Sequence, residues 1–546
     1  MSLLKSYLFV FSLILTINTV LAQKRKIIIT EKPSLIIGIV IEGMRYDYIY
    51  KYWDNFNENG FKKIIDKGTL CKNANYNYFL TQTAPGITTI ATGCEPTFHG
   101  IVSDYWYQRI KNNSTYSVFN TKVKTTGTNI DIYPFAPSNI LTTTFSDELK
   151  LFNNNKSKVI GISINPESAV LSAGHLGNYA YWLDDISGNW ITSSYYCDSL
   201  PKWVNKFNNK KIPDVYVNRE WLPLLSTNKY RDGEKSGKSK EIGFSSDNKF
   251  AKRIARHNNK NNPYSSLKAT PYATTLTKDF AISTIINENL GKDKYTDYLS
   301  IDFSSTSNVS KYCGVNSIEL EDMYIRLDRD LGHLLNFINE TIGLHNVLIY
   351  LTSDHGTSYN PEELKTHNLP SGVFNSDRAI MVLRTYMNAI YGQGKWVKAY
   401  HNKQIYLNRN LIEDTKLNLS EVQDVVSKFI LQFNGVSNTI TSSVMDKTHF
   451  NTGMFSYMQN SYNQKRSGDI FINLEPGWVE NNKNSTFANS AYKYDTHVPL
   501  IWYGWQIKKG SISNLINIED IAPTISNLLE IPLPNGCTGK IIEDLY

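Results

Sequence analysis

The sequence contains few cysteines, and none of them has the spacing of a metal-binding knot. Its 546 residues include five, Cys71, Cys94, Cys197, Cys313 and Cys537. No two of them form a CxxC pair, which argues against a structural zinc site built from cysteine. In an oxidising compartment at most two disulfides would form and leave one odd thiol. The spacing does not say which residues would pair.

Long apolar runs are also missing after the N-terminus. The chain starts with Met1-Ser2-Leu3-Leu4-Lys5, continues with an apolar stretch at 7–20 and reaches Val20-Leu21-Ala22. This pattern predicts a secretory signal peptide over residues 1–22. The alternative, a membrane anchor, would need roughly 20 apolar residues. We therefore expect a periplasmic or secreted protein that leaves the membrane after cleavage.

The charge pattern gives no sign of a nucleic-acid partner. The net charge of +7 is modest and its basic residues are scattered, whereas nucleic-acid binding needs a clustered basic stripe. Such a charge supports weak attraction for anionic substrates and nothing more. It does not predict an oligomeric state.

Short apolar runs alternate with helical periodicity along most of the chain. The helical pattern is clearest in residues 318–342 and 518–529. Alternation of this kind predicts an α/β fold, a three-layer sandwich with a mainly parallel central sheet between helices. The runs expected to be buried parallel strands are 35–41, 158–164, 298–303, 347–351, 470–474 and 498–503.

Polar residues gather at the ends of these expected strands. Glu42 follows the first strand, Asp354 and His355 follow the fourth, and His497 precedes the last. Singly, each is explained as well by a loop cap or a solvated rim residue. Because ligands of such sheets collect beyond the carboxyl ends of the strands, we expect the four to lie close together. Two carboxylates and two imidazoles are ligands that zinc accepts.

Thr83 is expected at or just before a helix N-terminus. It stands in Thr83-Ala84-Pro85-Gly86, and a helical stretch follows at 87–92. Pro in the first turn fits this position. The free amides of a helix N-terminus stabilise an anion there, although Thr83 taken alone would be better explained as an N-cap.

Nine motifs in order carry a family resemblance from about residue 34 to the C-terminus. They are Ile39-Val40-Ile41-Glu42-Gly43-Met44-Arg45-Tyr46-Asp47, Thr83-Ala84-Pro85-Gly86, His99-Gly100-Ile101, Ala173-Gly174-His175, Phe303-Ser304-Ser305-Thr306, Leu351-Thr352-Ser353-Asp354-His355-Gly356, Leu474-Glu475-Pro476-Gly477-Trp478, Tyr494-Asp495-Thr496-His497 and Asp520-Ile521-Ala522-Pro523-Thr524. With them the sequence resembles the secreted bacterial alkaline phosphatases that use a threonine nucleophile. These belong to the alkaline phosphatase superfamily, together with the nucleotide pyrophosphatase/phosphodiesterases.

The resemblance implies a two-zinc phosphoryl-transfer site, with ions about 4 Å apart. Thr83 falls on the nucleophile, which is also a ligand. Asp354 and His355 fall on ligands of the zinc beside it, and His497 falls on a ligand of the second zinc. The family's cap insertions correspond to about residues 166–289 and 361–468, within one domain spanning 23–546. The implied substrate is a small phosphate ester.

The metal ligands depart from the family pattern at three positions. Glu42 stands where the family has an aspartate, and both acids bind zinc. Ser307 replaces an aspartate and Lys311 a histidine at the second zinc. A protonated lysine cannot ligate a metal. We therefore expect one zinc ion per chain, with a second not excluded.

The substrate-binding positions have changed as well. Asp104 replaces an asparagine, and Asn165 and Glu167 replace a lysine and an arginine. A glutamate repels a phosphate that an arginine would bind. Glu167 and Lys311 are expected either to form an ion pair in the vacated space or to have drifted apart into solvent. Two hypotheses follow: a phosphoric-ester hydrolase with a degraded second metal site, or an inert member of the family that binds a ligand or partner through the old cleft.

Overall fold

The computed structural model describes residues 31–545 apart from 130–133, 232–251, 254–261 and 482–487. The expected signal peptide, residues 1–22, lies outside the described residues. No helix within the described ranges is long and apolar enough to cross a bilayer.

A large mixed sheet forms the centre of the molecule. Its strand order is β20-β2-β19-β12-β1-β11-β6-β7-β8-β5, and β21 also pairs with β2. The outer strands β20, β2, β19, β8, β5 and β21 span Gly510–Ile512, Thr69–Asn75, His497–Gly504, Trp190–Ser193, Thr125–Thr126 and Ile516–Asn517. The middle strands β12, β1, β11, β6 and β7 are parallel neighbours. These five strands span Val347–Thr352, Leu35–Ile41, Asp297–Phe303, Val159–Ser163 and Tyr179–Leu183. The α/β fold with a mainly parallel sheet is thus confirmed.

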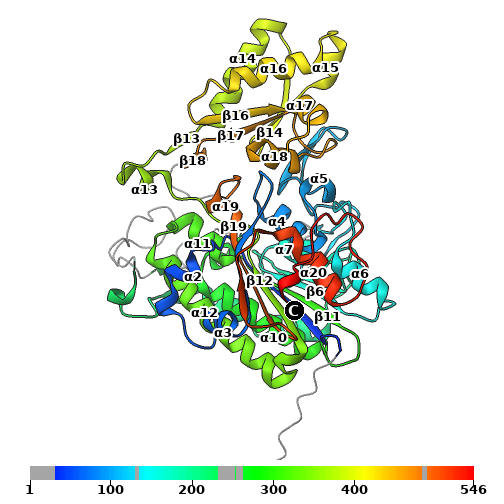
Figure 1. Ribbon diagram of the computed structural model, residues 1–546, viewed down its shortest axis with the longest axis vertical. Coiled ribbons are helices and arrows are strands. Elements are labelled where there is room, and N and C mark those ends of the chain that lie inside the picture. Colours follow the sequence, from blue (N-terminus) through cyan, green and yellow to red (C-terminus); the bar gives the residue numbers. More distant parts are fainter. Residues whose placement is uncertain (1–30, 130–133, 232–251, 254–261, 482–487, 546) are drawn as a thin grey trace, which may run out of the picture.

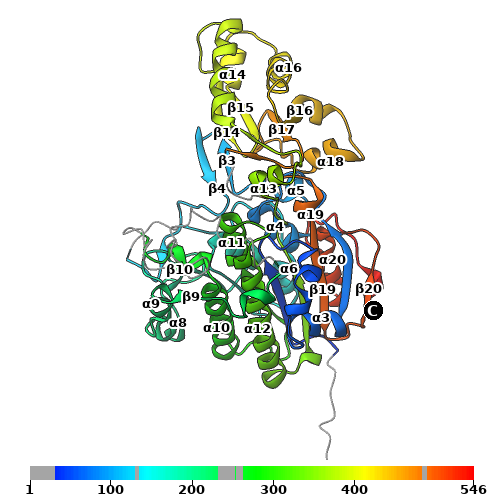
Figure 2. The same cartoon turned by 90° about the vertical axis from the view of Figure 1, so that its left-hand side faces the viewer.

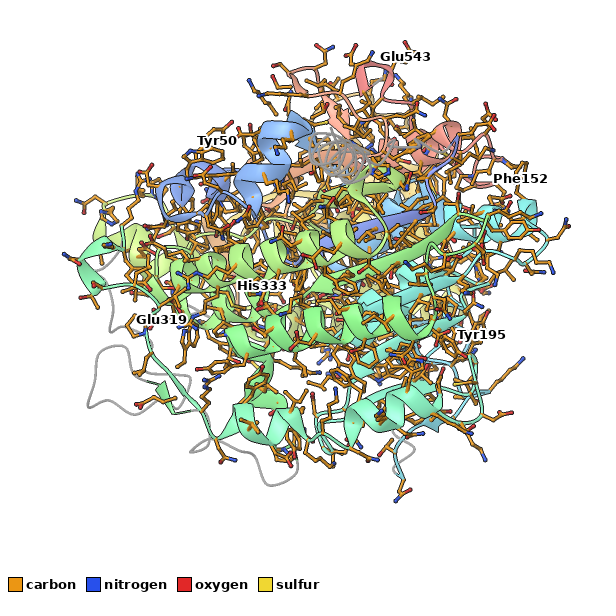
Figure 3. All side chains as sticks on the ribbon, turned by 90° about the horizontal axis from the view of Figure 1, so that it is seen from below. Tyr50, Phe152, Tyr195, Glu319, His333 and Glu543 are labelled. Atoms are coloured by element: carbon orange, nitrogen blue, oxygen red, sulfur yellow. The ribbon has the colours of Figure 1, made fainter. Side chains whose placement is uncertain are left out.

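Helices cover both faces of this sheet (Figures 1 and 2). The side chains of β1 alternate between two apolar cores: Ile37 and Ile39 face one core, and Ile36 and Val40 face the other. The first core contains α3 (Phe61–Lys67), α10 (Pro271–Asn287) and α12 (Ile318–Thr341). Seen from below, α10 and α12 run side by side, with His333 on α12 (Figure 3). The second core contains α4 (Thr83–Thr92), α6 (Phe145–Phe152), α7 (Pro166–Ala173) and α20 (Ile521–Leu528).

A second, smaller sheet stands above the first (Figure 1). Its antiparallel order is β14-β15-β17-β16, which span Val397–His401, Gln404–Leu407, Ile470–Leu474 and Val436–Thr441. Helices α14 (Ser376–Tyr391) and α16 (Leu419–Ile430) share an apolar core with it. A further cluster joins Phe79 and Leu80, just before α4, to Phe471 on β17. This contact anchors the smaller sheet beside the N-terminus of α4.

Three details differ from the sequence-based prediction. The run 470–474 is a strand, but it lies in the smaller antiparallel sheet, because its partners are β15 and β16. The run 498–503 lies within β19 (His497–Gly504), which is antiparallel to both β12 and β2. The expected cap over 166–289 is wrong at its start, because β7 pairs with β6 and β8 (Trp190–Ser193) pairs with β7, so both extend the main sheet.

Candidate active site

The carboxyl ends of two adjacent parallel strands bring the expected metal ligands together. Glu42 follows β1, while Asp354 and His355 follow β12. Helix α4 approaches them closely: a Cβ on Gly86 would lie 2.1 Å from the carbonyl oxygen of Asp354. Only glycine permits that approach, and it places Thr83, the first residue of α4, over the strand ends.

The hydroxyl of Thr83 lies between an acid and an imidazole. Its Oγ1 donates a hydrogen bond to Oε1 of Glu42 (3.2 Å) and lies 3.4 Å from Nε2 of His355. The other ring nitrogen of His355, Nδ1, lies 2.6 Å from the carbonyl oxygen of Gly356 and must donate to it. In a neutral ring, Nε2 therefore carries the lone pair that faces Thr83.

A divalent metal ion fits this set of side chains. Each of Glu42, Asp354 and His355 offers a ligand atom, and the three atoms lie within 4.8 Å of one another. Oδ2 of Asp354 is fully buried without a hydrogen-bond partner, and it lies 3.2 Å from Nε2 of His355. A lone pair and a carboxylate oxygen at that distance repel each other unless a cation or a proton lies between them. Two carboxylates, an imidazole and the Thr83 hydroxyl are suitable donors for zinc.

Further buried acids surround the cluster. Burial, reinforced by the negative charges of Asp354 and Asp302, raises the pKa of Glu42 well above its usual value. Burial and Asp354 also raise the pKa of Asp302 to about 8. Oδ1 of Asp302 accepts a hydrogen bond from Ser163 (2.8 Å), but its Oδ2 has no partner. Such a cluster favours a bound cation, because otherwise the carboxyls must hold protons.

Asp104 occupies the anion-binding end of α4. Its Oδ1 accepts a hydrogen bond from the backbone amide of Ala84 (2.9 Å), and its own amide donates to Oε1 of Gln82 (3.0 Å). Burial, followed by the charge of Glu167, raises the pKa of Asp104 to about 7. An amide that would otherwise be available to a phosphoryl oxygen is thus taken by a side chain of the protein.

Asn165 and Glu167, at the start of α7, lie on the same side of the site. Nδ2 of Asn165 donates to Oε2 of Glu42 (3.3 Å), which fixes the second oxygen of that carboxylate. Glu167 accepts a hydrogen bond from the hydroxyl of Tyr116. Burial raises its pKa, and Lys268 is the cation that opposes this shift. The structure pairs Glu167 with Tyr116, which contradicts the ion pair with Lys311, one of the two arrangements expected for these residues.

His497 and Lys311 are not brought into the ligand cluster. The ring of His497 stacks on Tyr46, with centroids 4.4 Å apart, and its Nε2 donates to the carbonyl oxygen of Lys72 (2.9 Å). Burial lowers the pKa of His497. Nζ of Lys311, on α11 (Ser305–Cys313), lies 5.6 Å from the ring centroid of the neighbouring Tyr312. The expected remnant of the second zinc site is therefore engaged elsewhere.

Three residues that contact the site were not predicted from the sequence: Asp302, Tyr116 and Gln82. Asp302 could have been found, because it is a charged residue next to the carboxyl end of the strand Asp297–Phe303, the end at which the other site residues gather. Tyr116 and Gln82 gave no signal, since one acts from a distant hairpin and the other looks like a polar residue in a turn. Gln82 also donates to Asn402 of the β14–β15 hairpin (3.1 Å), which links the site to the smaller sheet.

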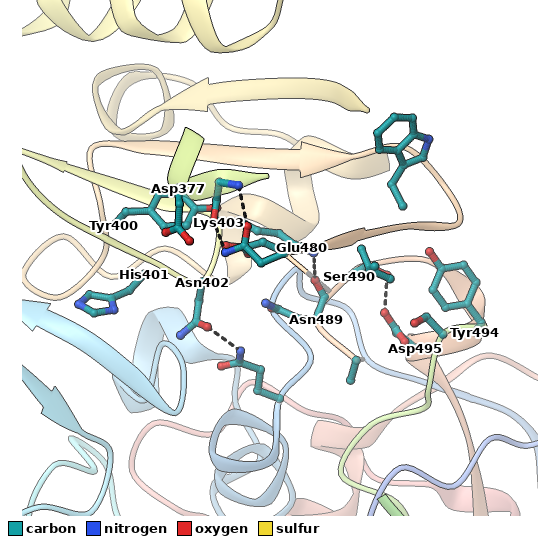
Figure 4. Close-up of a pocket in the computed structure, with 17 residues that line it drawn as sticks. Asp377, Tyr400, His401, Asn402, Lys403, Glu480, Asn489, Ser490, Tyr494 and Asp495 are labelled. Carbon is teal, nitrogen blue, oxygen red and sulfur yellow. Dashed lines mark hydrogen bonds between the residues drawn. The ribbon is translucent and has the colours of Figure 1, made fainter. Parts of the chain in front are cut away.

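A pocket of about 510 Å³ opens beside the site, between the two sheets (Figure 4). Its lining includes Gln82, Ser358 and Asp495, together with Asn402 and Lys403 between β14 and β15. Lys403 is buried and donates to the backbone oxygen of Asn489 (2.5 Å).

The fold, the threonine at a helix N-terminus and the adjoining metal-ligand set define a member of the alkaline phosphatase superfamily. Comparison with known proteins specifies the family. Residues 36–498 match the type I phosphodiesterase / nucleotide pyrophosphatase family, so the chain belongs to this family of phosphoester hydrolases.

Individual relatives match over almost the full length. The chain is similar to alkaline phosphatase PafA of Elizabethkingia meningoseptica, with 34% identity over 533 residues that cover 94% of each chain. It is 35% identical over 520 residues to a Myroides odoratus protein named calcium-transporting ATPase, covering 94% of this chain and 95% of that one. A crystal structure of wild-type alkaline phosphatase PafA superposes with a TM-score of 0.89 at 34% identity, over 94% of this chain and 99% of that one.

Proposed function

We propose that this chain is an exported phosphoric-ester hydrolase that uses Thr83 as its nucleophile and holds one zinc ion. The observation that carries the proposal is the position of the Thr83 hydroxyl, 3.2 Å from Oε1 of Glu42 and 3.4 Å from Nε2 of His355 at the N-terminus of α4. The names of the relatives support a phosphate ester as the substrate.

Glu42, Asp354, His355 and Thr83 would hold the ion. When bound, zinc supplies positive charge that lowers the pKa of a ligating hydroxyl and stabilises developing negative charge. Glu42 is placed to receive the proton of Thr83 as its oxygen forms a bond to phosphorus. The bond from phosphorus to the ester oxygen then breaks, and the leaving alcohol takes up the proton from Glu42. Water later attacks phosphorus and breaks its bond to Oγ1 of Thr83. One proton of the water restores the Thr83 hydroxyl, and its oxygen leaves with the released phosphate.

The surrounding charges favour a substrate with little negative charge. A phosphate monoester carries up to two negative charges at neutral pH, whereas a diester carries one. Asp104 and Glu167 place two acids beside Ala84 and Asn165, where a phosphoryl group attached to Thr83 would lie. Because like charges at close range repel, we propose slow hydrolysis of monoesters and a relative preference for diesters.

One observation favours the inert alternative. The carboxylate of Asp104 already accepts the hydrogen bond of the Ala84 amide. A neutral or cationic ligand could bind in the cleft without displacing this carboxylate. The two functions are separated by assaying an aryl phosphate monoester and diester with wild type, Thr83→Ala and Thr83→Ser. The proposal predicts slow turnover that is lost in Thr83→Ala and partly kept in Thr83→Ser. No turnover of either ester above the uncatalysed background, in wild type as in Thr83→Ala, would establish the alternative.

A further inference from the structure

The C-terminal end of α4 forms hydrogen bonds with the C-terminal segment, residues 536–539. Helix α4 ends at Thr92, and Gly93 follows in the left-handed conformation (φ 70°). The backbone amides of Thr538 and Gly539 both donate to the carbonyl oxygen of Gly93, at 2.9 and 3.0 Å. Oγ1 of Thr538 also donates to Oε2 of Glu95 (2.7 Å). Gly93 and Glu95, on the two sides of Cys94, thus form hydrogen bonds with Thr538 and Gly539, the two residues that follow Cys537.

The sulfur atom of Cys94 lies close to the backbone just before Cys537, and the sulfur atom of Cys537 lies close to the backbone just before Cys94. Sγ of Cys537 would be 2.8 Å from a Cβ on Gly93, the residue before Cys94. Sγ of Cys94 would be 3.7 Å from a Cβ on Gly536, the residue before Cys537. Each sulfur therefore reaches across to the backbone that carries the other. A disulfide requires the two segments that carry its cysteines to come this close, because its Cα atoms lie within about 7 Å of each other.

We propose that Cys94 and Cys537 form a disulfide in the exported protein, which fastens the end of the nucleophile-bearing helix to the C-terminal segment. The two thiols lose two protons and two electrons, and a sulfur–sulfur bond forms. The oxidant is the disulfide form of a thiol–disulfide exchange protein, which becomes the dithiol. The remaining cysteines belong to other parts of the fold: Cys71 lies on β2 (Thr69–Asn75), Cys197 after β8 and Cys313 on α11.

The surroundings indicate when the bond would form. Burial raises the pKa of Cys94 to about 12 and that of Cys537 to about 11. Since the thiolate is the species that attacks a disulfide, both groups are unreactive once they are packed. The bond therefore forms while the chain folds in an oxidising compartment. Protein that has folded in the cytoplasm should stay reduced.

Counting thiols tests the proposal. Full-length protein from an oxidising, secretion-competent host is denatured without reductant, and its free thiols are titrated. With five cysteines in the chain, the proposal predicts three free thiols in wild type and four in either Cys94→Ser or Cys537→Ser. The matched control Cys313→Ser should show two, because it keeps the pair. Five free thiols in wild type, or a peptide map that links a different pair, would overturn the assignment.

Thermal unfolding tests what the bond does. Reductant should lower the Tm of wild type by about 3–8 °C, the range expected for the loss of a disulfide in a large domain. The double variant Cys94→Ser/Cys537→Ser should already have the lower Tm and should not respond to reductant. If reductant shifts both proteins equally, the bond does not fasten these two segments.

Discussion

The carboxylate of Asp104 accepts a hydrogen bond from the backbone amide of Ala84, the residue that follows the proposed nucleophile, at 2.9 Å. In a helix that presents its N-terminus to a phosphoryl group, this amide is a natural donor to a phosphoryl oxygen. The acid thus competes with the substrate for the same hydrogen bond.

Replacing Asp104 by Asn should increase monoester hydrolysis. The amide oxygen of Asn can still accept from Ala84, but the negative charge is gone and an N–H donor is gained. Because one well-placed donor commonly contributes about 10²–10³ in rate, we expect a rise in kcat/KM of at least about tenfold. Asp377→Asn is the control. Asp377 lines the neighbouring pocket, and its replacement changes the net charge by the same amount as Asp104→Asn. A similar rise in both variants would mean that net charge alone is responsible.

The positions at the start of α7 should add to this effect. Asn165→Lys with Glu167→Arg restores two cations beside the phosphoryl group, and arginine binds phosphate through two charge-assisted hydrogen bonds. We expect a further increase of at least about tenfold in monoester kcat/KM. Tyr116→Phe removes the hydrogen bond to Glu167 and shows how much of the gain in kcat/KM comes from its loss alone. If Tyr116→Phe alone gives the same gain, the new cations are not the cause.

The second metal site should be hard to restore. Ser307→Asp with Lys311→His rebuilds two ligands, but His497 must leave the carbonyl of Lys72 and its stack on Tyr46 before it can ligate. A hydrogen bond of this kind contributes about 1 kcal/mol, and a stacked ring pair adds about 0.5–1.5 kcal/mol. We therefore expect the second zinc to bind at least about tenfold more weakly than the first in competition with a chelator. Two equally tight ions in the double variant would contradict this account of His497.

The stability of the metal-free protein should fall as the pH rises. The folded pKa values of Asp104 and Asp302, about 7 and about 8, lie above the ordinary value of 3.8. The folded state then binds more protons than the unfolded state between about pH 4 and pH 8, so stability is lost across this window. Tm in the presence of chelator should be higher at pH 5 than at pH 8.5, and excess zinc should reverse the loss at pH 8.5. Asp302→Asn should flatten the profile.

Much of this arrangement could be predicted from the sequence. The β-branched run 35–41 is a central strand, and the parallel order of β1 and β12 places Glu42 beside Asp354 and His355. The orientation of His497 could not be predicted, because it depends on the backbone oxygen of Lys72, far away in the chain. The partner of Glu167 was missed for a similar reason, since Tyr116 comes from a separate hairpin. Local patterns predict strands and their ends, but they do not predict which distant group forms a hydrogen bond with a polar side chain.

Zinc content is the measurement that tests the one-metal site most directly. Purified wild type is dialysed against metal-free buffer and assayed by elemental analysis, together with Asp354→Asn and His497→Ala. We predict about one zinc per chain in wild type, loss of that ion in Asp354→Asn and no change in His497→Ala. Two zinc ions in wild type, or an ion that is lost with His497 and kept without the charge of Asp354, would contradict the account.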